Sequence, residues 1–195
     1  MDLGLPSHTK WAAQNVGARK PSDAGLYFQW GDTVGYTADQ VGKDKNFNWS
    51  DYKWYLSGDN LDNLTFTKYT TTGATLALED DAAHVNMGGD WHMPTEDQIN
   101  ELINNTRREW TTQDGVNGIL FTSKDDTSKS IFIPTAGFAK KGSIHNSGEY
   151  GYVWSSAQNS VIGATAQCLF FYSDDHYTQG NVRLHGYSVR GVING

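Results

Sequence analysis

The chain has little of several residue types on which whole classes of protein depend. Its 195 residues include a single cysteine, Cys168, which excludes an internal disulfide and a cysteine-based zinc site. Charged residues make up 19% of the chain, below the roughly 25% of an average globular protein. No apolar run approaches the roughly 20 residues of a membrane-spanning helix. We therefore expect neither a disulfide-stapled scaffold nor insertion into a membrane.

Basic clusters and a secretion signal are also missing. The first residues, Met1 to Pro6, have neither the basic nor the apolar region of a signal peptide, so we expect a protein made without one or a segment of a longer secreted chain. The 15 basic residues against 22 acidic ones give a net charge of −7. Because proteins bind nucleic-acid backbones through groups of neutralising cations, we expect no nucleic-acid partner.

Glycine and aromatic residues are abundant. The chain has 21 glycines, above the roughly 7% of average composition, and its aromatic fraction is 13%. Its 37% of hydrophobic residues is too high for a disordered chain. Short elements, many turns and aromatic anchors are expected from this composition. With no internal repeat and no low-complexity linker, residues 1–195 are interpreted as one domain.

The clearest predicted helix covers residues 94–104. Thr95 and Gln98 form a capping box at its start, and Ile99, Leu102 and Ile103 recur at helical spacing to make one apolar stripe. A shorter helix is predicted from Pro21 through Trp30, because Pro-Ser-Asp is typical of a helix start.

Several further stretches have the composition of short strands, and 33–75 has no sustained period. A hairpin turn is predicted at residues 125–128. The fold class we expect is α+β, with about two helices, short antiparallel sheets and long loops. At least six short strands are predicted, over residues 10–16, 118–122, 130–134, 153–156, 166–172 and 187–192.

Seven phrases that span the chain carry a resemblance to a known family. They are residues 2–6 (Asp-Leu-Gly-Leu-Pro), 11–18, 27–32, 88–95 (Gly-Gly-Asp-Trp-His-Met-Pro-Thr), 131–137, 154–156 (Trp-Ser-Ser) and 186–190 (Gly-Tyr-Ser-Val-Arg). In this order they resemble the Fibrobacter major paralogous domain family. That family is similar to the formylglycine-generating-enzyme branch of the C-type lectin-like fold. The resemblance implies adjacent termini, a two-helix core and long loops in the C-terminal half, and it predicts that the segment around Leu3 neighbours that around Val189.

Proteins of this fold also serve as the variable proteins of diversity-generating retroelements. The resemblance implies that residues 154–190 are the variable ligand-binding region, framed by Trp-Ser-Ser and Ser-Val-Arg. The candidate ligand-binding residues are Asn159, Ser160, Val161, Ile162, Gln167, Cys168, Phe170, Tyr172, Asp174, His176, Tyr177, Gln179, Asn181, Leu184 and His185.

The orientation of the predicted strand 166–172 determines which of these side chains are accessible to a ligand. Side chains alternate between the faces of a strand, and the family pattern places Leu169 and Phe171 in the core. Cys168, Phe170 and Tyr172 then face outward. The alternative is a strand buried on both faces. We favour the first, because unpaired acids such as Asp174 are rare in completely buried strands. It predicts one contiguous exposed face, made of Gln167, Tyr172, His176, Tyr177, Asn181 and His185.

An enzymatic role is not expected. The related oxidase branch uses a pair of cysteines on this fold, and Cys168 is alone. The sequence does not decide whether Cys168 is buried. Free cysteines are usually found in the core, whereas its place on the strand face opposite to Leu169 favours the surface. No catalytic residue, cofactor or metal is expected, since the histidines lack ligand spacing. The acidic groups 59–63, 79–81 and 174–175 do not match a calcium loop and are interpreted as solvated, turn or helix-start acids.

The tryptophans separate into two groups. Those in or beside the family phrases are interpreted as core (Trp11, Trp30, Trp91, Trp110 and Trp154), and Trp49 and Trp54 are expected to pack over it.

We expect a non-enzymatic binding protein, displayed on a bacterial surface or a phage virion, whose partner is a protein or glycan on another cell or host. The alternative is an adhesin, surface lipoprotein or fimbrial domain of fixed specificity. No pattern indicates an oligomeric state.

Overall fold

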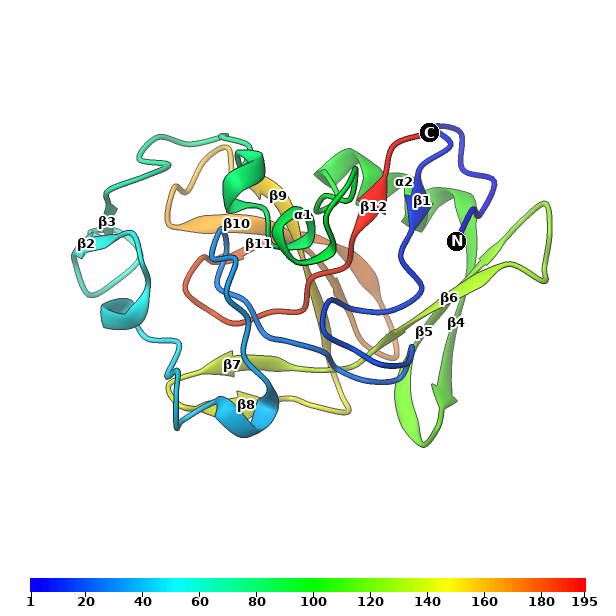
Figure 1. The fold of residues 1–195 in the computed structure, drawn as a ribbon, viewed down its shortest axis with the longest axis horizontal. Helices are drawn as coiled ribbons and strands as arrows, with labels where there is room; N and C mark the ends of the chain where they lie inside the picture. Colours follow the sequence, from blue (N-terminus) through cyan, green and yellow to red (C-terminus); the bar gives the residue numbers. More distant parts are fainter.

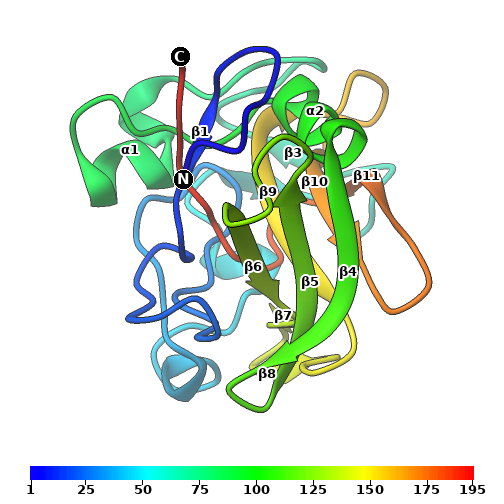
Figure 2. The same ribbon diagram turned by 90° about the vertical axis from the view of Figure 1, so that its right-hand side faces the viewer.

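A computed structural model describes the whole chain, residues 1–195, as a mixed α/β fold with two α-helices and many short antiparallel strands (Figure 1). Two three-stranded sheets dominate it. One has the order β4-β5-β6 and faces the viewer in Figure 2, and the other has the order β11-β10-β9. The strands of these sheets are β4 (Thr106–Gln113), β5 (Val116–Ser123), β6 (Ser130–Pro134), β9 (Gly151–Gln158), β10 (Thr165–Phe171) and β11 (His176–Val182).

Shorter elements complete the chain. The helices are α1 (Ala82–Met87) and α2 (Glu96–Asn105), and single 3-10 turns form at Ala38–Gln40, Trp49–Asp51 and Leu78–Asp80. The two-stranded pairs are β1 (Lys10–Trp11) with β12 (Val192–Ile193), β2 (Tyr55–Ser57) with β3 (Thr65–Phe66), and β7 (Phe138–Lys140) with β8 (Ser143–His145).

Helix α2 confirms its prediction. The Thr95 side chain accepts a hydrogen bond from the Gln98 backbone N–H at 3.1 Å, and the Gln98 side chain accepts one from the Thr95 N–H at 3.0 Å. Ile99, Leu102 and Ile103 are all buried. Local capping and one apolar stripe are therefore sufficient to position this helix.

The hairpin of β5 and β6 and strand β10 are also confirmed. Other predicted strands are shorter than expected: 10–16 is reduced to β1, and 187–192 is reduced to isolated bridges and β12. Strands β4 and β11 lie where no strand was predicted. Both carry many polar residues, so neither shows the apolar alternation that indicates a strand.

The helix predicted from Pro21 to Trp30 is wrong. Gly25 closes a turn with φ of 74°, where an added Cβ would lie 2.5 Å from the Val16 carbonyl oxygen. Tyr27 and Phe28 then run extended, bridging to other segments through their backbones. Tyr27, Phe28 and Trp30 are all buried, which one face of a short amphipathic helix would not achieve.

The acids at 79–81 prove to be structural. Asp81 caps α1 by accepting from the His84 N–H at 2.9 Å, as a helix-start acid does, and it also accepts from the Met93 N–H at 2.8 Å. Asp80 accepts from the Tyr69 hydroxyl at 2.8 Å and pairs with Lys53 and Lys68. Both carboxylates are buried, so the interpretation as solvated surface acids is wrong for them.

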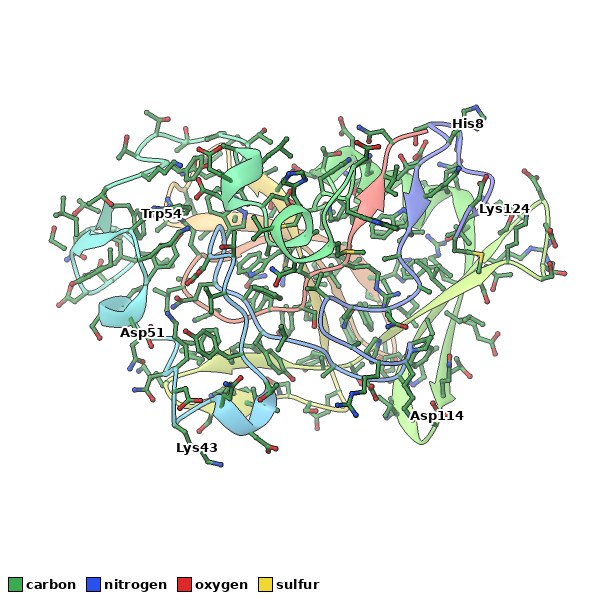
Figure 3. The ribbon with its side chains drawn as sticks, viewed as in Figure 1. His8, Lys43, Asp51, Trp54, Asp114 and Lys124 are labelled. Atoms are coloured by element: carbon green, nitrogen blue, oxygen red, sulfur yellow. The ribbon has the colours of Figure 1, made fainter.

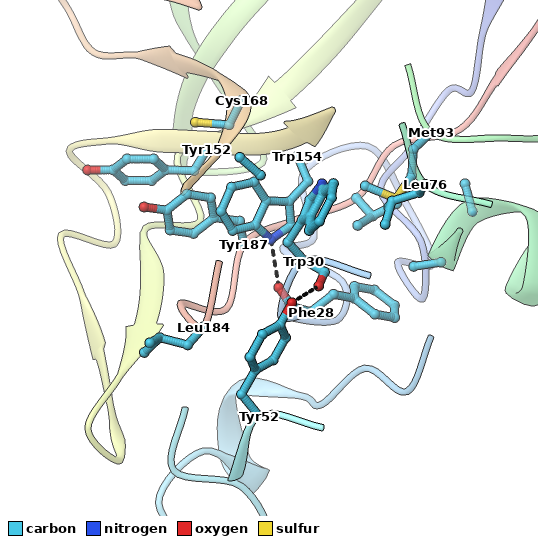
Figure 4. Packing of buried hydrophobic residues seen from close by; sticks show 14 of the residues in the cluster. Phe28, Trp30, Tyr52, Leu76, Met93, Tyr152, Trp154, Cys168, Leu184 and Tyr187 are labelled. Atoms are coloured by element: carbon cyan, nitrogen blue, oxygen red, sulfur yellow. Dashed lines mark hydrogen bonds between the residues drawn. The ribbon is translucent and has the colours of Figure 1, made fainter. Parts of the chain in front are cut away.

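Strand β10 lies between two hydrophobic cores, so the outward-facing interpretation of Cys168 and Phe170 is wrong. Leu169 and Phe171 belong, as predicted, to an aliphatic core with α2 and β5. Cys168 is buried in an aromatic core around Trp30, Trp154 and Tyr187 (Figure 4). Phe170 is buried in the same core. The strand is therefore buried on both faces, the alternative that the sequence had left open. Asp174, which argued against it, lies in the hairpin turn beyond the strand.

The tryptophans largely follow expectation. Trp11, Trp30 and Trp154 are completely buried, and Trp54 packs into the aromatic core. Trp49 packs against this core while half-buried. Trp91 and Trp110 are only half-buried, and Trp110 packs against the aliphatic core, so the interpretation of these two as core residues is only partly right.

The two ends of the chain lie side by side, as predicted (Figure 2). Trp11 pairs with Val192, and the Trp11 N–H donates to the Met1 carbonyl at 3.0 Å. Leu3 and Val192 share the aliphatic core. Neither α-helix has the length and apolar character needed to cross a membrane.

Candidate functional site

The candidate ligand-binding residues do not form one contiguous face. In the antiparallel register, Tyr177 pairs with Phe170 and Asn181 with Ala166, so Tyr177 and Asn181 share the side of the aromatic core. His176 pairs with Phe171 and Gln167 with Gly180, which places both on the opposite side of the sheet, with His176 beside Arg108 and Trp110 of β4. The Gln167 amide donates to the Glu96 carboxylate at 3.3 Å.

Their exposure also differs from the prediction. Cys168, Phe170 and Leu184 are buried, and Tyr177, at 40%, is the single exposed member of the six-residue face. The other five are half-buried, as are Asn159 and Gln179. The exposed candidates outside that face are Ser160, Val161, Ile162 and Asp174.

Cys168 is an inert core thiol. Burial raises its pKa to about 12, despite a hydrogen bond from the Asn181 amide at 3.2 Å. A thiol with such a pKa holds almost no thiolate at neutral pH, and the thiolate is the reactive form. The residue therefore offers no ligand contact and no nucleophile.

Three tyrosines form what we call the aromatic rim, Tyr150, Tyr172 and Tyr177. Their rings lie 5.5, 5.7 and 5.4 Å from the ring of Phe170, which supports them from below. Tyr150 and Tyr172 are half-buried and Tyr177 is exposed. Because Phe170 is fixed in the core, the rim presents large, rigid, amphipathic side chains to solvent, a type of surface that is common in binding sites.

A cleft of about 540 Å³ opens near the other end of β11. It lies on the side of the molecule where the β2–β3 and β7–β8 pairs both project (Figure 1). Its volume is within the roughly 300–1,000 Å³ of typical ligand sites. The residues that line it are Phe47, Asn48, Trp49, Asp59, Asn60, Leu61, Asp62, Lys140, Lys141, Val182, Leu184 and His185.

The Asp51 carboxylate shapes the wall of the cleft that contains Phe47 and Trp49. It accepts hydrogen bonds from the backbone N–H groups of Asn46, Phe47 and Asn48, each at 2.8 Å. Figure 3 shows Asp51 in the same projecting part of the molecule as Trp54. These bonds hold Phe47 in the left-handed region at φ of 57°, where its ring is completely buried.

Arg183 connects the segment 52–69 to the sheet. Its guanidinium is completely buried and lies 4.1 Å from the centre of the Phe66 ring. It donates to the Tyr52 hydroxyl at 3.1 Å and to the backbone carbonyls of Lys68, Tyr69 and Gly163. The residue was not predicted, because a lone arginine in a polar stretch carries no signal of burial.

His185 joins the cleft to the aromatic residues of the neighbouring sheet. Its ring lies 5.4 Å from that of Phe138, which in turn stacks on His145 at 5.3 Å. Burial lowers the pKa of His185 to about 4, and the nearby Lys140 and His145 act in the same direction. The imidazole is therefore neutral at physiological pH, and it offers hydrogen bonds without charge.

The molecule is thus a mixed α/β domain that carries an aromatic rim at one end of β11 and a cleft near the other. Comparison with protein-family models, with curated proteins and with solved structures finds no match to this chain.

Proposed function

We propose that the protein is a non-enzymatic recognition module of C-type lectin-like fold that binds a protein or glycan on another cell. The observation that carries the proposal is the aromatic rim, in which an exposed Tyr177 and two half-buried tyrosines rest on the buried Phe170. Such a surface gains contact area at low entropic cost. The adjacent termini, the two helices and the short strands support the fold assignment.

The environment of the single cysteine supports a role in binding rather than in cysteine-based catalysis. Cys168 is buried with its pKa raised to about 12, and its hydrogen-bond partner is Asn181 rather than a base. Catalysis by a cysteine needs a thiolate and an accompanying base. We further propose display on a bacterial surface or virion, where a module of this kind meets foreign partners.

A genomic test addresses the finer proposal that this is the variable protein of a diversity-generating retroelement. Neighbouring DNA is expected to encode a reverse transcriptase and to contain a near-copy of the segment for residues 154–190 that differs at adenines. If both are missing, the retroelement assignment fails.

The second candidate is an adhesin, surface lipoprotein or fimbrial domain of fixed specificity. The observation that favours it is the burial of Cys168, Phe170 and Leu184 inside the proposed variable region. Buried positions that join two cores tolerate few replacements. A genome neighbourhood without a reverse transcriptase leaves this candidate in place.

A binding assay tests the recognition role itself. Fluorescent protein is applied to a panel of bacterial cells and to an immobilised glycan array. We expect specific binding that Tyr177→Ser weakens about tenfold or more, as hot-spot tyrosines do. The matched control is Leu56→Ser, which removes an exposed apolar side chain on β2. Equal binding by Tyr177→Ser and the wild type, or no binding by the wild type, contradicts the proposal.

A further inference from the structure

The cleft near the end of β11 has charges of opposite sign on its two rims. Lys140 and Lys141 form one rim, and Asp59 and Asp62 form the other. The ion pairs of the protein involve other residues, and no salt bridge joins any of these four. The cleft is therefore polarised from rim to rim, and its charges do not neutralise each other.

The acidic rim is held in shape by its own hydrogen bonds. The Asn63 side-chain oxygen accepts from the backbone N–H groups of Asp59 and Asn60, at 2.8 and 3.0 Å. The Asn63 amide donates to the Asp59 carboxylate at 2.8 Å. Gly58 begins this loop with φ of 101°, where an added Cβ would lie 2.3 Å from the Asn63 carbonyl oxygen. Asp62 projects from the loop with a carboxylate that makes no hydrogen bond to the protein.

The basic rim is fixed in a similar way. Lys141 and Gly142 occupy the tight turn between β7 and β8, with φ of 48° and 76°. The Gly142 N–H donates to the Asn46 carbonyl at 2.7 Å, which ties the turn to the segment shaped by Asp51. Two rims held in this way stay apart instead of collapsing into ion pairs, so their charges are available to a ligand.

Besides the four charged residues, the lining combines five apolar residues with the neutral polar residues Asn48, Asn60 and His185. Phe47 and Leu184 are buried, Trp49 and Val182 are half-buried, and Leu61 is exposed at 44%. An apolar side chain placed there removes the accessible parts of Trp49, Leu61 and Val182 from water. A cleft with apolar walls and convergent charges is the usual composition of a ligand site.

We infer that the cleft binds a short peptide segment in which one apolar side chain lies between a cationic and an anionic group. The apolar side chain packs against Trp49 and Val182, the anionic group faces Lys140 and Lys141, and the cationic group faces Asp62. The inference rests on the proposed recognition function and assigns its partner as a protein. A neutral glycan leaves both rims unused, and an acidic glycan uses only the lysines.

Calorimetric titration with blocked tripeptides tests the inference. The probes are acetylated and amidated lysyl-phenylalanyl-glutamate, its two versions with glutamine in place of one charged residue, and the version with glycine in place of phenylalanine. We expect the first to bind about tenfold more tightly than each of the others, because every part contributes an independent contact. An acidic sialyl oligosaccharide is titrated in parallel.

Variants assign the binding to the cleft. Asp62→Asn should lower affinity about tenfold for peptides that contain lysine and leave the cation-free peptide unchanged. The Lys140→Gln, Lys141→Gln double variant should do the same for peptides that contain glutamate. The matched control is Lys43→Gln, because Lys43 points away from the body of the molecule at its lower edge (Figure 3).

Some outcomes would overturn the inference. These are equal affinity for the four peptides, tighter binding of the sialyl oligosaccharide, or the absence of peptide binding at millimolar concentration. Tyr177→Ser should leave peptide affinity unchanged, since the aromatic rim is not part of the cleft. The titration therefore reports on the cleft alone and the cell-binding assay on the rim, so that either proposal can fail separately.

Discussion

At the scale of single residues, Arg183 shows how a buried cation stabilises the wall of a site without a carboxylate partner. Its hydrogen bonds go to the Tyr52 hydroxyl and to three backbone carbonyls, and aromatic rings surround its guanidinium. Cation–π attraction and charge-assisted hydrogen bonds together offset the cost of removing the charge from water. Phe66 and the loop at Gly163 thereby become fixed to the same side chain.

Replacement of Arg183 should test this account. Arg183→Met retains much of the apolar volume, but it leaves the Lys68 carbonyl without a donor and the Tyr69 carbonyl with Gln158 alone. We therefore expect a loss of about 3 kcal/mol or more in the free energy of unfolding. Urea denaturation followed by tryptophan fluorescence measures it. The control Arg107→Met lies on exposed β4 and should change the free energy by less than about 0.5 kcal/mol. Equal effects of the two variants would contradict a clamping role.

His185 should make stability depend on pH. Burial lowers its pKa in the folded protein from 6.5 to about 4, so between these values the unfolded chain binds more protons. The stability that depends on a neutral His185 is complete above about pH 6.5 and is lost as the pH falls toward 4. His185→Gln should reduce this loss by roughly 1–3 kcal/mol. Urea denaturation at pH 7 and pH 4.5 measures the difference. If the variant loses as much free energy of unfolding at pH 4.5 as the wild type does, His185 is not responsible for the pH dependence.

At the scale of elements, β10 and β11 are neighbours with opposite constraints. Both faces of β10 lie against hydrophobic cores, whereas β11 is the edge strand of the same sheet and carries half-buried or exposed polar residues. The β11 strand still contacts α2, through a hydrogen bond of 3.3 Å from the Thr178 hydroxyl to Asn100. Accessible side chains are thus supplied by β11, and rigidity is supplied by β10.

A pair of substitutions should separate these roles. Phe170→Ala removes a ring that touches both the aromatic core and the rim, so a loss of about 3–5 kcal/mol in stability is expected. Tyr177→Ala, directly opposite on β11, should cost about 1 kcal/mol or less because its ring is partly in water already. Thermal or urea denaturation of both variants gives the comparison. Similar losses would show that the edge strand is packed as tightly as its neighbour.

The sequence predicts elements whose signals are local. Capping by Thr95 and the stripe that includes Ile99 define α2 without reference to the rest of the chain. The segment through Phe28 has a local helix start but pairs with Tyr187, far along the chain, and that partner decides its conformation. The face of Cys168 could not be predicted, because alternation carries no information once both sides of a strand are covered.

The candidate site was predicted only in part, for a related reason. His185 and Leu184 lie in the predicted region and do line the cleft. The opposite wall of the cleft comes from residues 47–62, and its basic rim comes from Lys140 and Lys141. No spacing along the chain relates these segments. A site built from three distant segments becomes visible only when the fold brings them together.

At the scale of the whole molecule, the chain closes on itself. Val192 accepts and donates backbone hydrogen bonds with His92 while β12 pairs with β1. Arg190, completely buried with its pKa lowered to about 9 by burial, donates to Asn15 at 3.0 Å. The last residues thus bind the first segment and the loop before α2 in one contact region.

Shortening the chain should expose this dependence. Removal of 192–195 deletes a buried valine and its pairing with two segments, so we expect a loss of about 3 kcal/mol or more in the free energy of unfolding. Removal of 194–195 alone takes away the hydrogen bonds of Asn194 with Gln98 and His92 and should cost about 1 kcal/mol. Circular dichroism during urea denaturation distinguishes them, and equal stability of the longer deletion and the intact chain would refute the closure.

The double burial of β10 limits how such a domain can be diversified. A combinatorial library with randomised codons across 165–171 would yield mostly chains that fail to fold, whereas randomisation at 160–162 and at outward positions of β11 would keep most clones viable. The number of different surfaces that a folded clone can present therefore depends on how many side chains contact solvent. It grows with each of these positions and not with the length of the randomised segment.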